Sequence, residues 1–292
     1  MLEVIEDTLM DSIKLLPFLF LTYLILEYIE HKMGEKSKQT IQKSGKFGPL
    51  IGSILGVFPQ CGFSVSATNL YAGRVITLGT LIAVYLSTSD EMLPIFISEA
   101  VSPWVILKIL AVKLIIGMVA GFAIDLIIRI WRKKNQKIGQ EEKAEEGIEH
   151  LCEHDHCHCE EGSIWKSALN HTLQIFLFIM IITFIINVLV FWIGEENISH
   201  LMLNQPILGP IIAGAVGLIP NCAASVIITN LYLQNVISAA SMIAGLLTGA
   251  GIGLAVLFKT NQGFKQNIKI VGLLYAIGVI SGLLLEWIGI AF

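Results

Sequence analysis

The sequence predicts an all-α polytopic integral membrane protein with two inverted repeats, each of about five helical segments that include a re-entrant or broken-helix hairpin. Three observations lead there: few charges, recurrent apolar segments and an internal repeat. Only 14% of the 292 residues are charged and 54% are hydrophobic, whereas soluble domains carry about 25% charged residues. Windows of about 20 apolar residues can each cross the ~30 Å hydrocarbon core of a bilayer, and they lie at 13–29, 104–128, 173–193, 236–258 and 268–290.

The same polar, helix-breaking motif occurs twice in this apolar chain. It reads FPQCGFSVSATNLY at 58–71 and IPNCAASVIITNLY at 219–232, a shift of 161 residues. Between 48–71 and 209–232, 12 of 24 positions are identical. Because internal repeats fix the architecture, we expect a first membrane repeat over 1–131, a linker over 132–163 and a second membrane repeat over 164–292.

The distribution of basic residues predicts how the halves are oriented. Lys and Arg cluster at 32–46, 129–137 and 259–269, and such clusters favour the cytoplasmic side of the membrane. All three reach one side only if 49–71 and 210–232 enter and leave on the same side. The halves are then inverted, the linker is cytoplasmic, both termini lie outside and the protein resides in the cytoplasmic membrane. A second break near 93–97 stays open.

The repeated motif predicts a substrate site. Pro59 and Pro220 interrupt their helices, and irregular backbone at membrane depth lines a cavity or is buried in protein. Cys61 and Cys222 follow directly, and thiolates suit soft ions such as Zn, Cu(I), Cd or trivalent arsenic. Buried Cys also packs simply as a small hydrophobe. The other candidates are polar residues at matching places: Gln60, Asn221, Ser64, Ser225, Thr68, Thr229, Asn69 and Asn230. The hydroxyl groups could instead satisfy main-chain carbonyls, and the amides could join helices.

The halves differ at one place, where Ser87–Glu91 matches Thr248–Ile252. An ionisable side chain at membrane depth is a functional candidate. Asp90 is therefore expected to be a metal ligand or to compensate charge and carry protons. The alternative is an extramembrane turn in which Asp90 caps the following helix.

The linker holds the densest set of metal-ligating residues. Four His and three Cys fall within HLCEHDHCHCEE at 150–161, and such tracts are typical of metal binding. We expect a transition-metal ion to bind at His150, Cys152, His154, His156, Cys157, His158 and Cys159.

The paired motifs, the Ser-Thr-Ser-Asp-Glu stretch at 87–91, the Thr-Gly-Ala-Gly-Ile-Gly stretch at 248–253 and the His-rich loop together resemble the heavy-metal exporter permeases. Members of this family are described as arsenic efflux proteins or manganese transporters with ten membrane segments. The resemblance implies efflux of a metal or metalloid ion, such as Zn, Mn or Cd.

We therefore expect a secondary transporter and not an enzyme, since the sequence holds neither a Walker motif nor a nucleophile–base pair at usable spacing. Its partners would be the bilayer and the metal ion, without nucleic acid, and a homodimer stays open. Two other functions stay open as well. One is a carrier of a small sulfur- or selenium-containing or anionic solute, and the other is an intramembrane metal sensor without flux.

Overall fold

The computed structural model describes residues 9, 13, 16–17, 19–25, 47–58, 62–89, 91–136, 164–193 and 207–289. This part of the chain is helical and has no strands. The first half contains α3 (Gly48–Gly56), α4 (Gly62–Ala72), α5 (Leu78–Ser87), α6 (Met92–Ser98) and α7 (Pro103–Gln136). The second contains α9 (Ile164–Ile193), α11 (Leu208–Gly217), α12 (Cys222–Leu233), α13 (Ala239–Thr248), α14 (Gly253–Thr260) and α15 (Phe264–Ile288).

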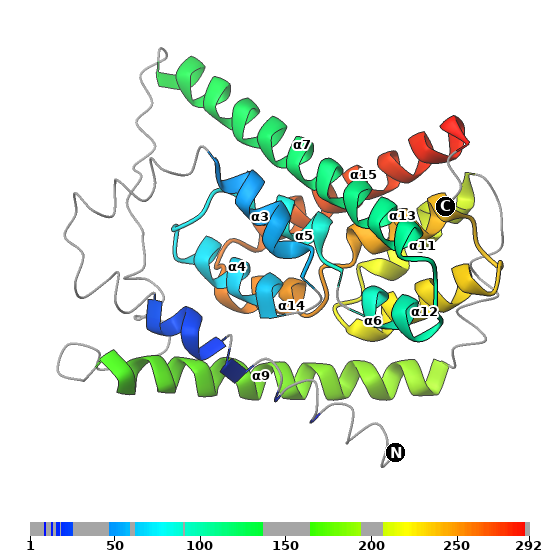
Figure 1. The fold of residues 1–292 in the computed structure, drawn as a ribbon. Helices are drawn as coiled ribbons and strands as arrows, with labels where there is room; N and C mark the ends of the chain where they lie inside the picture. Colours follow the sequence, from blue (N-terminus) through cyan, green and yellow to red (C-terminus); the bar gives the residue numbers. More distant parts are fainter. Residues whose placement is uncertain are drawn as a thin grey trace.

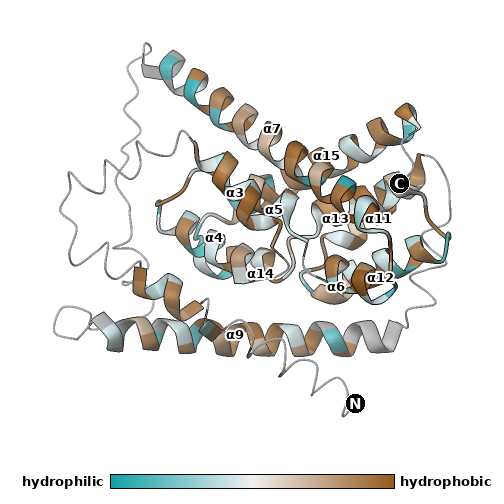
Figure 2. Cartoon of the chain, viewed as in Figure 1, coloured by the Kyte–Doolittle hydropathy of each residue, from teal (hydrophilic) through white to brown (hydrophobic). Residues whose placement is uncertain are grey.

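Five stretches within the described residues are long and apolar enough to span a membrane. Three are the long helices α7, α9 and α15, whose outward faces carry apolar side chains such as Trp104, Val119 and Ile280 at more than half exposure. Figure 2 shows these helices mostly in brown, with teal at the C-terminal end of α7. Exposed apolar area of this extent requires lipid. The chain is therefore a multi-pass membrane protein.

The other two spans are interrupted helices in the interior. The span 78–98 consists of α5 and α6, and the span 239–260 consists of α13 and α14. Both are mostly buried, and α5 contacts α13 directly. The break between α5 and α6 is the second interruption that the sequence left open.

Each half also contains a pair of short helices joined at the repeated motif. Helix α3 has 9 residues and α11 has 10, and at 1.5 Å per residue such helices are about 14–15 Å long, half of a bilayer core. In the second half, Pro220 lies between α11 and α12 as its helix-breaking character predicts. The helices therefore break where the sequence predicted, and re-entry on one side stays a prediction.

Hydrogen bonds recur at a spacing of 161 residues. Thr77 Oγ1 donates to Asp125 Oδ2 (2.7 Å) in the first half, and Ser238 Oγ donates to Glu286 Oε2 (2.8 Å) in the second. Both hydroxyl oxygens also accept the amide of the residue three positions on, which caps α5 and α13. The preceding turns match too, since Arg74 and the corresponding Asn235 both have φ of 58°. The sequence repeat is thus also a repeat of local structure.

The halves exchange elements at their interface. Helix α4 packs against α14 of the other half, and α12 packs against α6. Figure 1 shows α7 and α15 diverging to opposite sides of the molecule. Helix α9 runs across the face opposite α7 and α15, and its Ile175 and Ile179 form a buried cluster with Leu19 and Val65 of the first half. The inversion of the halves and the boundaries of the three regions stay predictions.

Candidate transport site

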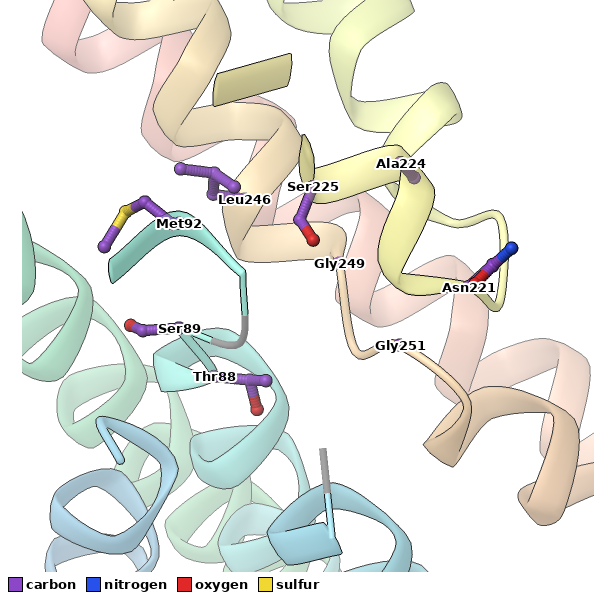
Figure 3. A pocket seen from close by; sticks show the side chains of 9 residues that line it. All are labelled: Thr88, Ser89, Met92, Asn221, Ala224, Ser225, Leu246, Gly249 and Gly251. Carbon is purple, nitrogen blue, oxygen red and sulfur yellow. The ribbon is translucent and has the colours of Figure 1, made fainter. Parts of the chain in front are cut away.

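A small enclosed cavity lies between the broken helices of the first half and the hairpin of the second. Its volume is about 10 Å³, which is near the minimum for one water molecule. Figure 3 shows Thr88, Ser89 and Met92 on the first-half side of the cavity, and Ala224 and Ser225 on α12. The complete lining within the described residues is Thr88, Ser89, Met92, Asn221, Ala224, Ser225, Leu246, Gly249 and Gly251. Helix breaks from both halves therefore meet at one cavity.

The hairpin of the second half presents its polar residues through local turn geometry. Asn221 has extended backbone and is the N-cap of α12, and Ser225 Oγ donates to the carbonyl of Cys222 (2.7 Å). The Asn221 amide nitrogen donates to Asn187 Oδ1 of α9 (2.5 Å). Figure 3 shows the Asn221 side chain directed away from Ser225. Asn221 therefore joins the hairpin tip to α9, while Ser225 faces the cavity.

On the first-half side, the chain leaves helical geometry at Thr88, the C-cap of α5. The Thr88 hydroxyl donates to the Val84 carbonyl (2.8 Å), and the Ser89 hydroxyl donates to the Ser87 carbonyl (3.1 Å). Met92 begins α6 and is fully buried. This wall of the cavity thus contains two hydroxyl-bearing residues and a methionine, whose thioether is polarizable.

The symmetry-related position is filled by a hydrogen-bonded cluster. Thr68 Oγ1 lies 2.6 Å from Tyr85 Oη, and both hydroxyl oxygens lie 3.2 Å from the Gly253 carbonyl oxygen. At a shift of 161 residues, Tyr85 corresponds to Leu246 and Gly253 to Met92. Tyr85 therefore closes the first site, whereas the smaller Leu246 leaves space at the second.

Among the residues that the structure describes, Asn69 has a buried side chain without a hydrogen-bond partner. It is 1% exposed, and neither its amide nitrogen nor its amide oxygen has a partner. An orphaned buried amide costs about 1–3 kcal/mol, and one in a native structure points to a bound water or ion. Its counterpart Asn230 is only half-buried. The predicted site role of Asn69 therefore has a physical motive.

Lys113 lies behind the cavity wall, in the middle of α7. Its side chain is 0% exposed, and its Nζ donates to the carbonyl oxygens of Thr88 and Leu246, the latter at 3.1 Å. Both of these residues also line the cavity. The buried Lys113 amine thus bridges carbonyl groups of the two halves at the candidate site.

The structure brings together only some of the predicted site residues. Asn221 and Ser225 line the cavity with the polar stretch at 88–89, while Cys222 lies between them as a half-buried thiol outside a disulfide. Thr68 and Thr229 are fully buried and donate to the carbonyls of Ser64 and Ser225 (both 2.7 Å). The Thr229 hydroxyl is thus bonded within its own helix, whereas Thr68 also contacts Tyr85 and the Gly253 carbonyl of the other half.

Several predicted ligands lie outside the described residues. They are Gln60, Cys61 and Asp90 in the membrane part, and His150, Cys152, His154, His156, Cys157, His158 and Cys159 in the linker. Among the residues that the structure describes, no group of three or more His, Cys, Asp and Glu side chains is placed to hold a metal ion.

The residues at the site that the sequence prediction did not name include Tyr85, Met92, Lys113 and Asn187. A signal for the first three exists in the repeat, since their counterparts are Leu246, Gly253 and Leu274. Paired positions around the cavity differ in chemical type, as they also do at Asp90 and Gly251. Asn187 gives no comparable signal, because a single amide in an apolar helix is common.

Comparison with known proteins decides the family. A family model described as "Putative, 10TM heavy-metal exporter" matches residues 1–192. The chain belongs to this family. The match confirms the resemblance seen in the motifs, and for the heavy-metal exporters it implies a metal ion as substrate. The matched region contains the first half, the linker and nearly all of α9, and 193–292 carries the remainder of the repeat. No curated protein and no solved structure matches the chain.

Proposed function

We propose that the protein is a secondary transporter that exports a transition-metal or metalloid ion across the cytoplasmic membrane. The ion would pass through a site near the membrane midplane where the broken helices of two inverted halves meet. Paired interrupted helices in the two halves of a transporter are the usual place for substrate binding.

The cavity between Thr88, Met92 and Ser225 carries this proposal. It is enclosed by breaks from both halves, and its volume of about 10 Å³ accepts one water-sized particle. A dehydrated metal ion has this size, whereas an organic sulfur or selenium solute does not. The Met92 thioether and the hydroxyl oxygens supply the mixed soft and neutral donors that such an ion requires.

The hairpin tips would supply the stronger ligands. Cys222 begins α12, where the helix dipole favours negative charge on a thiolate, and Cys61 is its counterpart in the first hairpin. We assign Gln60, Asn69, Asn221 and Asn230 as amide contacts, and Asp90 as the group that compensates charge. These amides and Asp90 would act together with the hydroxyls of Ser64, Ser225, Thr68 and Thr229. The orphaned amide of Asn69 supports this assignment.

The His- and Cys-rich linker would bind the same class of ion on the cytoplasmic side. This step rests on ligand chemistry, because the tract at 150–161 contains four imidazoles and three thiols. Deleting 150–161 should then reduce the number of Zn²⁺ or Cd²⁺ ions bound per purified chain, measured by equilibrium dialysis.

Inside-out membrane vesicles test the transport proposal. We expect wild-type vesicles to accumulate Cd²⁺ or Zn²⁺ when an ion gradient is imposed. The double variant Cys61→Ser/Cys222→Ser should lose Cd²⁺ uptake at least tenfold and retain more of its Mn²⁺ uptake, because oxygen donors suit the harder ion. Ser98→Ala, at the exposed end of α6, is the matched control and should transport normally.

Three outcomes would count against the proposal. Equal Cd²⁺ uptake by the double variant would remove the thiolates from the site. Binding without accumulation would favour an intramembrane sensor. Uptake of a selenium or sulfur anion that survives both chelators and deletion of 150–161 would favour the carrier of such solutes.

A further inference from the structure

The two interrupted helices α5 and α13 end close to one point. Helix α5 ends at Ser87 with Thr88 as its C-cap, and α13 ends at Thr248. The last four carbonyl groups of a helix lack partners within that helix and carry its partial negative charge. Helix C-termini from both halves therefore direct carbonyl oxygens into the interior of the molecule.

Local geometry frees the Leu246 carbonyl of α13 from its helical partner. The amide of Gly249 bonds to the Gly245 carbonyl (3.0 Å), and the amide of Ala250 bonds to the Thr248 carbonyl (2.9 Å). In a continuing helix the Ala250 amide would instead take the Leu246 carbonyl. The break at Gly249 thus frees Leu246 O, which accepts from Lys113 Nζ at 3.1 Å.

Lys113 reaches this point from a third helix. It enters from α7, is 0% exposed, and also donates to the Thr88 carbonyl. Its repeat counterpart on α15 is Leu274, which is equally buried but apolar. The shared fold of the two halves does not require a lysine at this position, because the matching position holds an uncharged residue. An intramembrane lysine retained in such a place has a functional reason by default.

We propose that the carbonyl oxygens of Thr88 and Leu246 form a monovalent cation site shared by the two halves, filled here by the tethered ammonium of Lys113. The site is distinct from the cavity but adjoins it, because both residues also line the cavity. The side chain would hold the ends of α5 and α13 together. It would also place a fixed positive charge beside any ion that enters. This cation site does not depend on the proposed export function or on the identity of the transported species.

Chemical rescue tests the site. Lys113→Ala deletes the atoms of a propylammonium ion and should lower the thermal denaturation midpoint of the purified full-length chain by several degrees. Propylammonium at millimolar concentration should restore most of that loss, because it returns both the charge and the donors. 1-Propanol, which lacks the charge, should not. Leu274→Ala leaves a cavity at the paired position and should respond to neither compound. Lys108→Ala, on the exposed face of α7, should behave as the wild type.

Two results would overturn the proposal. Equal rescue by 1-propanol would mean that the site needs a hydrogen-bond donor and not a cation. Propylammonium rescue of Lys113→Ala no greater than that of Leu274→Ala would mean that no specific site exists. Should Lys113→Ala fail to fold, Lys113→Met keeps the volume and removes the charge. It must then denature at a lower temperature than the wild type, while Leu274→Met must not. Equal stability of Lys113→Met and the wild type would also overturn the site.

Discussion

At the N-terminal ends of α5 and α13 the two halves are built alike. Thr77 bonds to Asp125 as Ser238 bonds to Glu286, with distances that differ by only 0.1 Å, from 2.7 to 2.8 Å. At the opposite ends of the same helices the halves diverge. Tyr85, Met92 and Lys113 of the first half correspond to Leu246, Gly253 and Leu274 of the second. The two halves are thus alike in the hydrogen bonds at the N-terminal ends of α5 and α13. They differ in the residues around the cavity.

The largest loss of stability is expected at the paired glycines Gly56 and Gly217, where the two halves are built alike. A Cβ at Gly56 would lie 2.6 Å from the Val84 carbonyl, and one at its counterpart Gly217 would lie 2.1 Å from the Gly245 carbonyl. Gly56→Ala and Gly217→Ala should each cost about 3 kcal/mol, because main-chain atoms must move. Thermal denaturation in detergent measures this. Gly272→Ala, with nothing within 4 Å, is the control. If only one of the two variants lost much stability, the two halves would not be equivalent at these positions.

A smaller loss of stability is expected when the Thr77–Asp125 or the Ser238–Glu286 hydrogen bond is removed, and the two losses should differ. Asp125 accepts both Thr77 Oγ1 and the Gly79 amide (2.9 Å), whereas Glu286 accepts Ser238 Oγ. Asp125→Ala should cost about 2 kcal/mol and Glu286→Ala about 1 kcal/mol, because the first also leaves a helix-terminal amide without its charged acceptor. If Glu286→Ala lowered the denaturation midpoint more than Asp125→Ala, the number of hydrogen bonds to each carboxylate would not determine its contribution to stability.

Asn69 and Asn230 are a further pair of repeat positions that differ between the halves, in burial. Asn69→Leu removes an orphaned buried amide and should raise stability by about 1–2 kcal/mol, while metal uptake into vesicles falls. Asn230→Leu, at a half-buried position, should change stability little. A residue kept for packing would behave in the opposite way, with stability lost and uptake retained, and that result would remove Asn69 from the site.

The smallest effect concerns the cluster that closes the first site. Tyr85→Phe removes a hydroxyl bonded to Thr68 and to the Gly253 carbonyl, at a cost of about 1 kcal/mol. The control is Tyr275→Phe, which loses a bond to the Ile211 carbonyl (3.1 Å) away from the cavity. If the cluster joins the halves, Tyr85→Phe should speed proteolysis at the linker, and Tyr275→Phe should not.

Much of the architecture was predictable because its causes are local. Proline breaks helices, long apolar runs span membranes, and the repeat can be read by alignment. The cavity was only half predictable. Asn221 and Ser225 belong to the break, but Lys113 is one lysine in a long apolar helix, and nearby Lys108 is exposed. The repeat marks Lys113 as a departure, because its counterpart is Leu274. What Lys113 bonds to depends on the packing of α7 against the end of α13, a contact that spans 133 positions of sequence.

The exchange of elements between the halves bears on how the protein is made. Helix α4 packs on α14, and α6 packs on α12, so each early element rests on a later one. As the ribosome releases the first half, Thr68 and Tyr85 precede the Gly253 carbonyl by 185 and 168 residues. The first half therefore cannot complete these contacts until the second half has been synthesised and inserted. If translated as two separate chains, the halves would meet through the same crossed pairing, as subunits of an obligate dimer do.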